Sequence, residues 1–223
     1  MSEKPAPEKP LRRDAEENRR RLLDAAAAVF AESGLEATMD DVAERAGVGV
    51  GTAYRRFANK EELLDALFRE RIGELDEIMD RAGSTDDPWQ GVVSYLRDTV
   101  TLTAGDRGLR ELMLNPPEGL DFVDEARLRL GPKIDALVAR AHGTGSLRSG
   151  VESGDLVMVV LMLSTVADYR HDQAEPPWHR YFELVVGGLR ADAGEAFPGV
   201  APSAQEADEL IKAAHQVRRR KGA

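Results

Sequence analysis

The sequence predicts an all-α protein in which a small N-terminal helical unit is joined by a long helix to a larger helical domain. Three observations predict this fold class. Alanine, leucine, glutamate and arginine are abundant, whereas aromatic residues make up only 5% of the 223 residues, and this composition favours helices. Apolar residues recur at intervals of three and four along most of the chain. Residues that cap or stop helices separate these amphipathic segments.

Two helices are expected before residue 47. Residues 1–13 are polar and proline-rich and are expected to form a disordered arm. A helix is then expected over residues 14–33, and Gly34 is placed to end it. Thr38 begins the second helix, because an acidic residue, Asp41, follows it at the spacing of a capping box.

Two further helices complete the N-terminal unit. Gly47 is expected to stop the second helix, and a short third helix is expected over residues 50–57. Asn59 is in a cap-like position before the fourth helix, which carries a long apolar stripe. Since the stripe runs to about residue 81, this helix is long enough to link two domains. The expected division is therefore an arm (1–13), a small helical domain (14–60) and a second domain (61–223).

The charge distribution leaves nucleic acid open as a partner. The net charge is −10, but residues 1–60 hold 11 of the 30 basic and 11 of the 40 acidic residues, so the whole excess lies in residues 61–223. Residues 45–60 contain basic residues and no acidic one. A local basic face in an acidic protein can bind a polyanion, although such a stretch also arises by chance.

The segment VGVGTAYRRF, residues 48–57, could contact phosphate either as a nucleotide-binding loop or as part of a helix-turn-helix. Its glycines could belong to a nucleotide-binding loop, but a dinucleotide loop needs a buried strand before it, and the preceding residues have a helical pattern. A P-loop needs Gly-Lys-Ser/Thr, which the sequence lacks. A glycine-containing turn between two short helices is typical of a helix-turn-helix, whose second helix enters the major groove.

Residues 38–67, TMDDVAERAGVGVGTAYRRFANKEELLDAL, resemble the N-terminal DNA-binding domain of the TetR family of transcriptional regulators. The matching pieces are the preceding helix AAAAVFAESGLEATMDDVAERAGV, the Gly-Thr-x-Tyr of residues 51–54, the aromatic Phe57, and Lys-Glu-Glu-Leu at 60–63. Gly49 stands where the family often has serine, and Ala53 stands where a larger apolar residue is common. The resemblance implies a homodimeric regulator, expected to be a repressor that a small-molecule effector releases from a palindromic operator.

The resemblance also implies which residues meet DNA. Tyr54 and Lys60 are implied phosphate contacts, with a packing tyrosine and a solvated lysine as alternatives. Arg45 and Arg55 are the candidates for base readout, because arginine pairs bidentately with guanine for ~1–3 kcal/mol of discrimination; phosphate contact alone is the alternative. The expected DNA-binding residues are Thr38, Arg45, Gly49, Val50, Gly51, Thr52, Tyr54, Arg55 and Lys60.

The second domain is expected to consist of helices over residues 88–103, 106–114, 121–142, 155–167, 177–189 and 203–220. Residues 155–167 are apolar nearly all round, and residues 177–189 carry an apolar stripe beside Gly187 and Gly188. We expect these two helices to form a four-helix bundle across a two-fold axis, with the intramolecular core as the alternative. The expected interface residues are Leu156, Val160, Leu163, Trp178, Tyr181, Phe182, Val185 and Leu189.

An effector pocket is a family expectation, placed between the long fourth helix and the helices of residues 88–167. Methionine and aromatic side chains suit an adaptable apolar pocket, although at helical spacing they are also common in cores. The expected lining residues are Trp89, Tyr95, Arg110, Met113, Phe122, Met158, Met162 and Tyr169. Arg110 or His171 is the expected polar anchor.

Other function classes find little support in the sequence. The four histidines lack metal-ligand spacing, and neither Gly-x-Ser-x-Gly nor a catalytic pair of carboxylates is recognisable. We therefore expect no enzyme, metal or cofactor; a helical DNA-binding protein without a small-molecule effector is the main alternative. The chain has no cysteine, which makes a reducing cytoplasm the expected location. No signal peptide is recognisable, and the longest apolar run, residues 156–167, is shorter than the ~18 residues of a membrane span.

Overall fold

The computed structural model describes residues 9–114, 121–167, 178–195, 197, 199–202 and 206–207. Within these residues the chain is helical, and its one β-bridge joins Leu147 to Arg190. No helix of this part of the chain is both long enough and apolar enough to cross a membrane. The helices are α1 (Lys9–Ser33), α2 (Met39–Ala46), α3 (Val50–Arg56), α4 (Lys60–Ser84), α5 (Pro88–Gly105), α6 (Arg107–Leu114), α7 (Asp121–Gly143), α8 (Ser153–Ala167) and α9 (Trp178–Leu189), with short 3-10 helices at Gly34–Glu36 and Ala191–Ala193.

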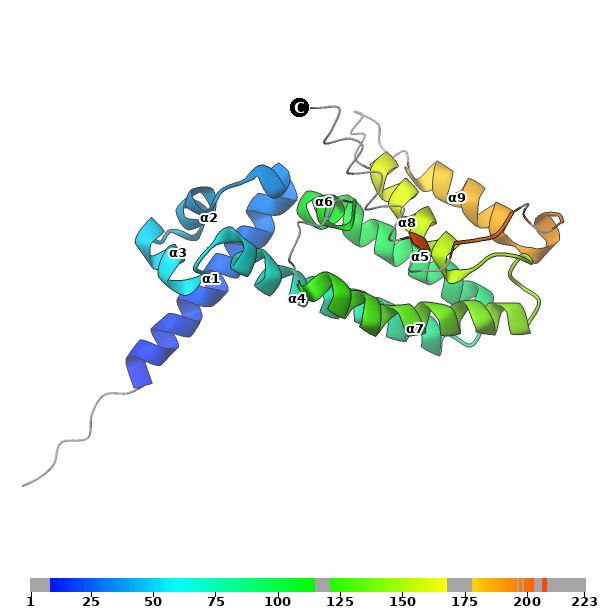
Figure 1. Cartoon of the computed structure of the whole chain (residues 1–223), viewed down its shortest axis with the longest axis horizontal. Coiled ribbons are helices and arrows are strands. Elements are labelled where there is room, and N and C mark those ends of the chain that lie inside the picture. The colour runs from blue at the N-terminus through cyan, green and yellow to red at the C-terminus, as the bar shows by residue number, and fades with distance from the viewer. Residues whose placement is uncertain are drawn as a thin grey trace, which may run out of the picture.

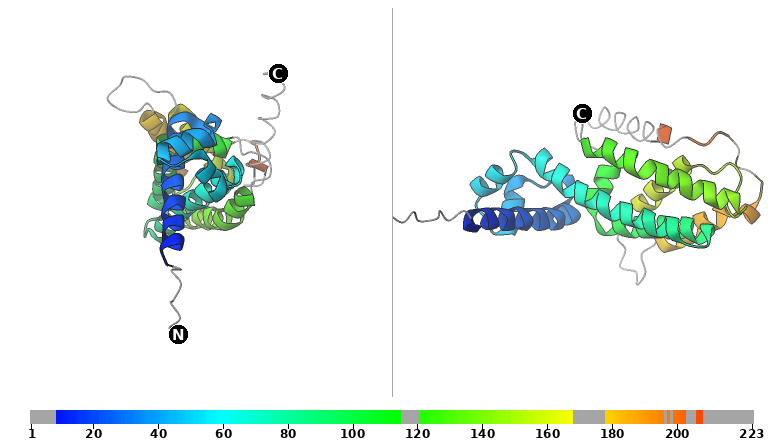
Figure 2. Two further views of the ribbon diagram at one scale, coloured as in Figure 1. Left: turned by 90° about the vertical axis from the view of Figure 1, so that its left-hand side faces the viewer. Right: turned by 90° about the horizontal axis from the view of Figure 1, so that it is seen from below.

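The molecule has two parts that share the long helix α4. Helices α1, α2 and α3 surround the beginning of α4, and α4 then continues beside α7 in the second part (Figure 1). Helices α5 and α8 lie against each other, and α9 packs on α8. The view from below shows the N-terminal helices at one end of an elongated molecule (Figure 2). Helix α4 thus places the small N-terminal unit at a distance from α8 and α9.

Local capping signals confirm most of the expected boundaries in the N-terminal part. The side chain of Thr38 accepts a hydrogen bond from the Asp41 amide, and the Asp41 carboxylate accepts one from the Thr38 amide, which completes the capping box. Gly47 ends α2 in the left-handed conformation, and the Asn59 side chain caps α4. Helix α1 begins at Lys9 rather than at residue 14, so residues 9–13 of the expected arm are helical.

Two hydrophobic clusters form the interior. The first cluster joins α1, α2 and α3 to the first part of α4 and extends to Ile72, beyond the expected domain boundary at residue 60. It also includes Leu109 and Leu112 of α6, which are 3% and 4% exposed. The second cluster joins the rest of α4 to α5, α7, α8 and α9. Helix α6 therefore completes the core of the N-terminal part although its sequence lies in the second part.

Ion pairs align α4 with α7 along the second part. The Asp76 carboxylate, whose side chain is 12% exposed, accepts a hydrogen bond of 2.6 Å from Arg129 and also pairs with Lys133. Lys133 reaches Asp80 one turn further along α4. The hydrogen bonds from Lys133 and Arg129 hold the pKa of Asp76 below its ordinary value. If Asp76 were protonated, or replaced by asparagine, the positive charges of Arg129 and Lys133 would face each other without the carboxylate between them.

Asp76→Asn is expected to lower the free energy of unfolding by about 1–2 kcal/mol, since the full cost of breaking a buried pair is reduced where the cations reach solvent. The Asp76 pKa is depressed in the folded protein, so its contribution is present above the unfolded pKa of ~3.9 and lost as the pH falls through the folded pKa. Urea unfolding at pH 7 and at pH 3 measures both effects. Asp80→Asn, at a side chain that is 66% exposed, is the control with a smaller expected loss. An Asp76→Asn deficit that persists undiminished at pH 3 would contradict this account.

Candidate nucleic-acid interface and the domain behind it

Helix α3 presents one side to the core and the other to solvent. Ala53 is fully buried and Phe57 is 3% exposed, and both belong to the first hydrophobic cluster. On the opposite side, the large hydrophobic residues Val50 and Tyr54 are 42% and 48% exposed. The small residue Ala53, which departs from the expected family pattern, fills its buried position without leaving its side chain accessible. Because Ala53 and Phe57 pack in the core, they determine which side of α3 faces solvent.

The start of α3 is built without a side-chain cap. Gly49 is the N-cap residue, and its carbonyl oxygen accepts hydrogen bonds from the amides of Thr52 at 2.7 Å and Ala53 at 3.2 Å. A Cβ at Gly51 would meet no heavy atom of the protein within 4 Å. The backbone at the start of α3 is therefore open to close approach by a large partner such as DNA.

The polar residues of α3 are pre-arranged. The Arg55 guanidinium donates a hydrogen bond of 3.0 Å to the Thr52 hydroxyl, and the Arg55 side chain is exposed. Together with Gly49, Val50, Gly51 and Tyr54, these residues form the outer surface of α3, which we call the recognition surface: Gly49, Val50, Gly51, Thr52, Tyr54 and Arg55. The structure thus brings six of the nine expected DNA-binding residues together on one short helix and its cap.

The other three expected DNA-binding residues each form a hydrogen bond with another residue of the protein. They are Thr38, Lys60 and Arg45. The Thr38 hydroxyl takes part in the capping box with Asp41, and these hydrogen bonds lower the pKa of the Asp41 carboxyl. The Lys60 ammonium group donates to the carbonyl oxygen of Leu35, so Lys60 is not the solvated lysine that was the alternative to a phosphate contact. Any phosphate contact by Lys60 would have to replace or share this hydrogen bond.

Arg45, an expected base reader, forms an ion pair with an acidic residue of α1. Its guanidinium nitrogens lie 2.9 and 3.3 Å from the two carboxylate oxygens of Glu32, and both side chains are largely exposed. The hydrogen bond from Arg45 lowers the pKa of Glu32. Because the Arg45 guanidinium is paired with the Glu32 carboxylate, base readout by Arg45 requires this ion pair to open. The sequence reasoning did not include Glu32, since nothing in the pattern places α1 beside the end of α2.

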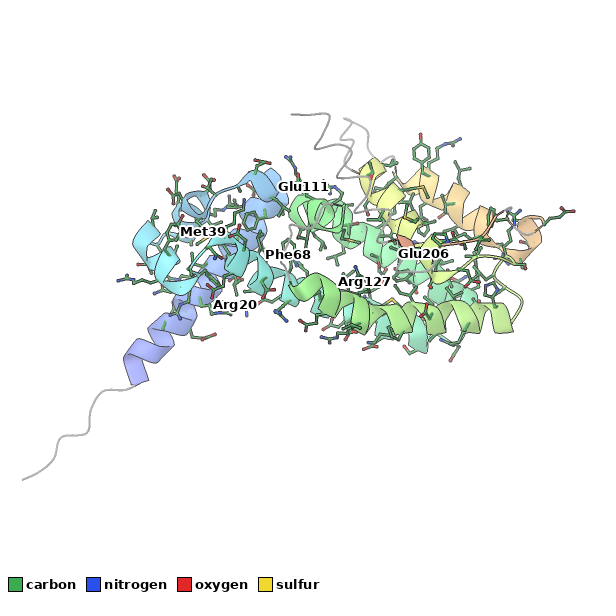
Figure 3. All side chains as sticks on the ribbon, viewed as in Figure 1. Arg20, Met39, Phe68, Glu111, Arg127 and Glu206 are labelled. Carbon is green, nitrogen blue, oxygen red and sulfur yellow. The ribbon has the colours of Figure 1, made fainter. Side chains whose placement is uncertain are left out.

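Helix α6 binds the turn that joins α1 to α2. The Glu111 carboxylate accepts a hydrogen bond of 2.6 Å from the Leu35 amide and a second one from Arg107 at 2.7 Å. Figure 3 shows Glu111 where α6 meets the end of α1, and Phe68 on α4. Gly34 has a φ of +74°, and a Cβ there would overlap the Glu111 carboxylate. The positive φ therefore favours glycine at this turn, whereas the overlap alone would require only a shift of the flexible Glu111 side chain.

A second close contact joins α6 to α1. A Cβ at Gly108 would lie 2.8 Å from the Phe30 Cβ and 3.1 Å from the Phe30 carbonyl oxygen. On the other side of α6, the Arg110 guanidinium donates a hydrogen bond of 2.7 Å to the Thr103 carbonyl oxygen of α5. Arg110 is 5% exposed. One short helix thus touches the N-terminal part through Gly108 and Glu111 and the second part through Arg110.

The expected effector-lining residues are not all in one place. Trp89 and Tyr95 are buried in the second cluster, and Met113 packs against both clusters. Met158 and Met162 instead line a groove on the outside of α8, so they do not belong to the expected interior pocket. They were misplaced because α8 is apolar nearly all round, and such a pattern does not show which face is inside. The Phe122 side chain, Tyr169 and His171 lie outside the described residues.

Helix α5 carries a buried polar stripe, of which only Tyr95 was among the expected effector-lining residues. Tyr95, Thr99 and Thr103 are four residues apart and are 5%, 2% and 0% exposed. The Thr103 hydroxyl shares a hydrogen bond of 2.7 Å with the Ser164 hydroxyl of α8. The Thr99 hydroxyl, in contrast, is buried with no hydrogen-bond partner among the residues that the structure describes. Burial raises the pKa of Tyr95, so its phenol remains a hydrogen-bond donor.

Most of the expected dimer-interface residues are part of the chain's own core. Six of them are at most 5% exposed and pack in the second cluster, so they present little surface to a second copy. They are Leu156, Val160, Leu163, Trp178, Phe182 and Leu189. Tyr181 is 48% exposed, and Val185 is half-buried at the outer groove. An apolar helix pattern predicts burial, but it does not distinguish burial inside one chain from burial between two.

No group of three or more histidine, aspartate or glutamate side chains that could hold a metal ion occurs in the described ranges. His142 lies in the last turn of α7, and its Nε2 donates a hydrogen bond of 2.8 Å to the Val151 carbonyl oxygen. The basic residues 218–221 and the predicted helix over 203–220 lie outside the described residues, except for two helical residues at 206–207.

Comparison with known proteins assigns both parts of the chain. Residues 22–67 match the family model of the bacterial regulatory proteins of the tetR family, and residues 87–191 match the C-terminal domain of SbtR-like transcriptional regulators. The fatty acid metabolism regulator protein of Bacillus subtilis is 41% identical over 146 residues, which cover 60% of this chain and 69% of that protein. The HTH-type transcriptional regulator SrpR of Pseudomonas putida is 31% identical over 144 residues, and the match covers 64% of this chain and 65%, just under two thirds, of SrpR.

A solved structure extends the likeness to the fold. The crystal structure of a TetR transcriptional regulator from Streptomyces coelicolor has 29% sequence identity and a TM-score of 0.56, and the match covers 77% of this chain and 98% of that one. The chain belongs to the TetR family of bacterial transcriptional regulators.

Proposed function

We propose that this protein acts as a homodimeric repressor that binds a pseudo-palindromic operator through α3 and leaves it when a small molecule enters the second part. The recognition surface of α3 is the observation that supports this proposal most strongly. It combines an uncrowded backbone at Gly49 and Gly51, an exposed valine for contact with a thymine methyl, and an arginine held by Thr52. These are the kinds of group that read base edges in the major groove.

The proposed dimer follows from the small size of the recognition surface. Helix α3 has seven residues, and one such helix makes few contacts with DNA. Two copies related by a two-fold axis read two half-sites about one helical turn apart, ~34–36 Å, and linking them multiplies their effect. The exposed side chains of Met162 on α8 and of Tyr181 and Leu184 on α9 supply a surface for this pairing.

The proposed switch uses α6. This helix contributes Leu109 and Leu112 to the core of the N-terminal part, while Arg110 reaches the end of α5. A ligand that changes the position of α5 relative to α8 therefore acts on Gly108 and Glu111, and through them on the turn before α2. The coupling is reciprocal, so operator DNA weakens effector binding by the same factor, of order 1–3 kcal/mol.

The polar stripe of α5 is the proposed place for the effector's polar group. A buried hydroxyl without a partner costs ~1–3 kcal/mol, and a bound molecule that hydrogen-bonds to Thr99 would remove that cost. Tyr95 offers a donor one turn away on the same face, and the surrounding second cluster is apolar. The structure therefore favours a mostly apolar effector that carries at least one hydrogen-bonding group.

Thr99→Val is expected to raise the free energy of unfolding of the ligand-free protein by about 1 kcal/mol, because it removes an unpaired buried hydroxyl without changing side-chain volume. Thr103→Val on the same helix is the matched control. It loses the hydrogen bond to Ser164 and is expected to be destabilised by about 1 kcal/mol. Urea unfolding measures both variants. Equal destabilisation would mean that the Thr99 hydroxyl already has a partner in the protein, which would remove the support for this effector site.

The proposed function is tested by affinity selection of genomic DNA fragments from the source organism on the purified full-length protein, beginning with the region upstream of its own gene. Enrichment of a pseudo-palindrome at low salt is the expected result, and adding candidate apolar molecules to the enriched complex then searches for the effector. A Tyr54→Ala, Arg55→Ala double variant is the control and is expected to enrich nothing. Equal enrichment by wild type and control would contradict a role for α3.

A further inference from the structure

Helix α1 brings a carboxylate to the basic segment that runs from the end of α2 through α3. Residues 45–60 contain no acidic residue, but Glu32 of α1 pairs with Arg45 from 13 positions away. The two other ion pairs among the described side chains of residues 15–60 lie within α1, between residues four positions apart. In this part of the chain, the Glu32–Arg45 pair is therefore the one that joins two helices.

The pair occupies both terminal nitrogens of the Arg45 guanidinium. Nη2 lies 2.9 Å from Oε1 of Glu32, and Nη1 lies 3.3 Å from Oε2. Bidentate contacts of arginine with guanine and with phosphate also use two parallel N–H donors. DNA that contacts these two nitrogens must therefore displace the Glu32 carboxylate.

The pair is weak enough to be displaced. The Arg45 side chain is 50% exposed and the Glu32 side chain is 61% exposed. An ion pair exposed to this degree changes an equilibrium by a factor of about 1.4 to 5. A bidentate arginine–guanine contact changes it by about 5 to 150, so a guanine opens the pair. A phosphate offers the same kind of charged oxygen as the carboxylate, so the exchange brings it little gain.

Arg45 is close in the chain to the recognition surface. It lies in the last turn of α2, and Gly49, the N-cap residue of α3, follows four positions later. The turn between the two helices of the motif therefore separates Arg45 from α3. The ionic state of Arg45 is set by Glu32 at the point where the motif meets DNA.

We infer that Glu32 competes with DNA for Arg45 and thereby lowers the affinity of the protein for every DNA sequence. This inference rests on the proposed function. In the operator complex the pair has to open, and in a complex with other DNA it withholds Arg45 from the phosphates. Both complexes therefore lose about the same factor, and the preference for the operator is unchanged. The lower affinity assists release, because an effector coupling of about 5- to 150-fold has less binding to overcome.

Fluorescence anisotropy of the full-length chain tests the inference on two duplexes, the enriched genomic fragment and a scrambled sequence of the same length and base composition. Glu32→Gln is expected to bind both about 2- to 25-fold more tightly than wild type, from a factor of about 1.4 to 5 in each of two protomers. Glu44→Gln is the matched control, since Glu44 is exposed beside Arg45 and has no ion-pair partner among the described residues. Its gain is expected to stay below about twofold, because salt screens an unpaired charge. A gain for Glu32→Gln no larger than that of the control would overturn the inference.

The same comparison in an Arg45→Gln background separates competition from the charge of Glu32 alone. The gain from Glu32→Gln is expected to fall below about twofold there, because no guanidinium remains to be released. An equal gain in both backgrounds would overturn the inference, and so would weaker binding by Glu32→Gln, which is the result expected if the pair only supports the fold. A wild type that does not prefer the enriched fragment to the scrambled one would overturn the proposed function as well.

Discussion

Arg55→Ala is expected to weaken operator binding by about 5- to 150-fold, which corresponds to the ~1–3 kcal/mol of a bidentate arginine–guanine contact. Arg55 is exposed on the outer side of α3, and its hydrogen bond to Thr52 fixes the direction in which the guanidinium points. A base contact predicts that the loss is concentrated at one base pair in each half-site. Fluorescence anisotropy with the selected fragment and a set of single-base substitutions of it measures the size of the loss and its position.

Two further variants serve as comparisons for the Arg55→Ala binding experiment. Tyr54→Phe removes one hydroxyl that the family resemblance assigns to phosphate, so it is expected to weaken all sequences alike. Arg81→Ala changes an exposed arginine near the far end of α4, paired with Asp98 at 3.3 Å, and is expected to leave DNA binding unchanged. If Arg55→Ala weakens all fragments equally, Arg55 binds phosphate and the base-readout role is wrong.

Gly108→Ala is expected to displace α6 from α1 and to lower the free energy of unfolding by about 1–3 kcal/mol, the usual cost of overpacking. The added methyl group would lie 2.8 Å from the Phe30 Cβ and 3.1 Å from the Phe30 carbonyl oxygen, so one of the two helices would have to shift. Operator affinity is expected to fall as well, because the Glu111 hydrogen bond to Leu35 fixes the turn before α2. Urea unfolding and operator titration of the same preparation measure the two effects.

Gly73→Ala is the matched control for this prediction. Gly73 lies inside α4, where an added Cβ meets nothing within 4 Å. A helical glycine replaced by alanine without a clash is expected to stabilise the protein by about 0.5–1 kcal/mol. Equal stability of the Gly108→Ala and Gly73→Ala variants would mean that the contact between α6 and Phe30 does not constrain the two parts, and the proposed route from effector to DNA would lose its physical basis.

The sequence alone predicts the elements that depend on interactions between residues close together in the chain. The capping box at Thr38, the glycine at the end of α2 and the cap at Asn59 each involve residues within four positions of one another, so they can be recognised without tertiary information. The same holds for the outer side of α3. Its apolar and polar residues alternate with the period of a helix, and the family resemblance adds which side meets DNA.

Contacts between distant segments could not be predicted. The hydrogen bond from Leu35 to Glu111 joins residues 76 positions apart, and the ion pairs of Asp76 join α4 to a helix more than fifty positions away. Lys60 and Arg45 carried the right charge for DNA contact, but their neighbours Leu35 and Glu32 became known only from the fold. The expected dimer residues are a similar case. The helical period of α8 and α9 predicts that these residues are buried, but it does not predict which residues they pack against.

A nuclease footprint of the full-length protein on an enriched genomic fragment tests the central claim most directly. The account predicts two protected regions of equal strength, related by two-fold symmetry, with centres about one helical turn or a multiple of it apart. The Arg55→Ala variant is expected to show the same spacing at higher protein concentration. A single protected region, or protection that the Tyr54→Ala, Arg55→Ala variant reproduces in full, would contradict operator recognition by two copies of α3.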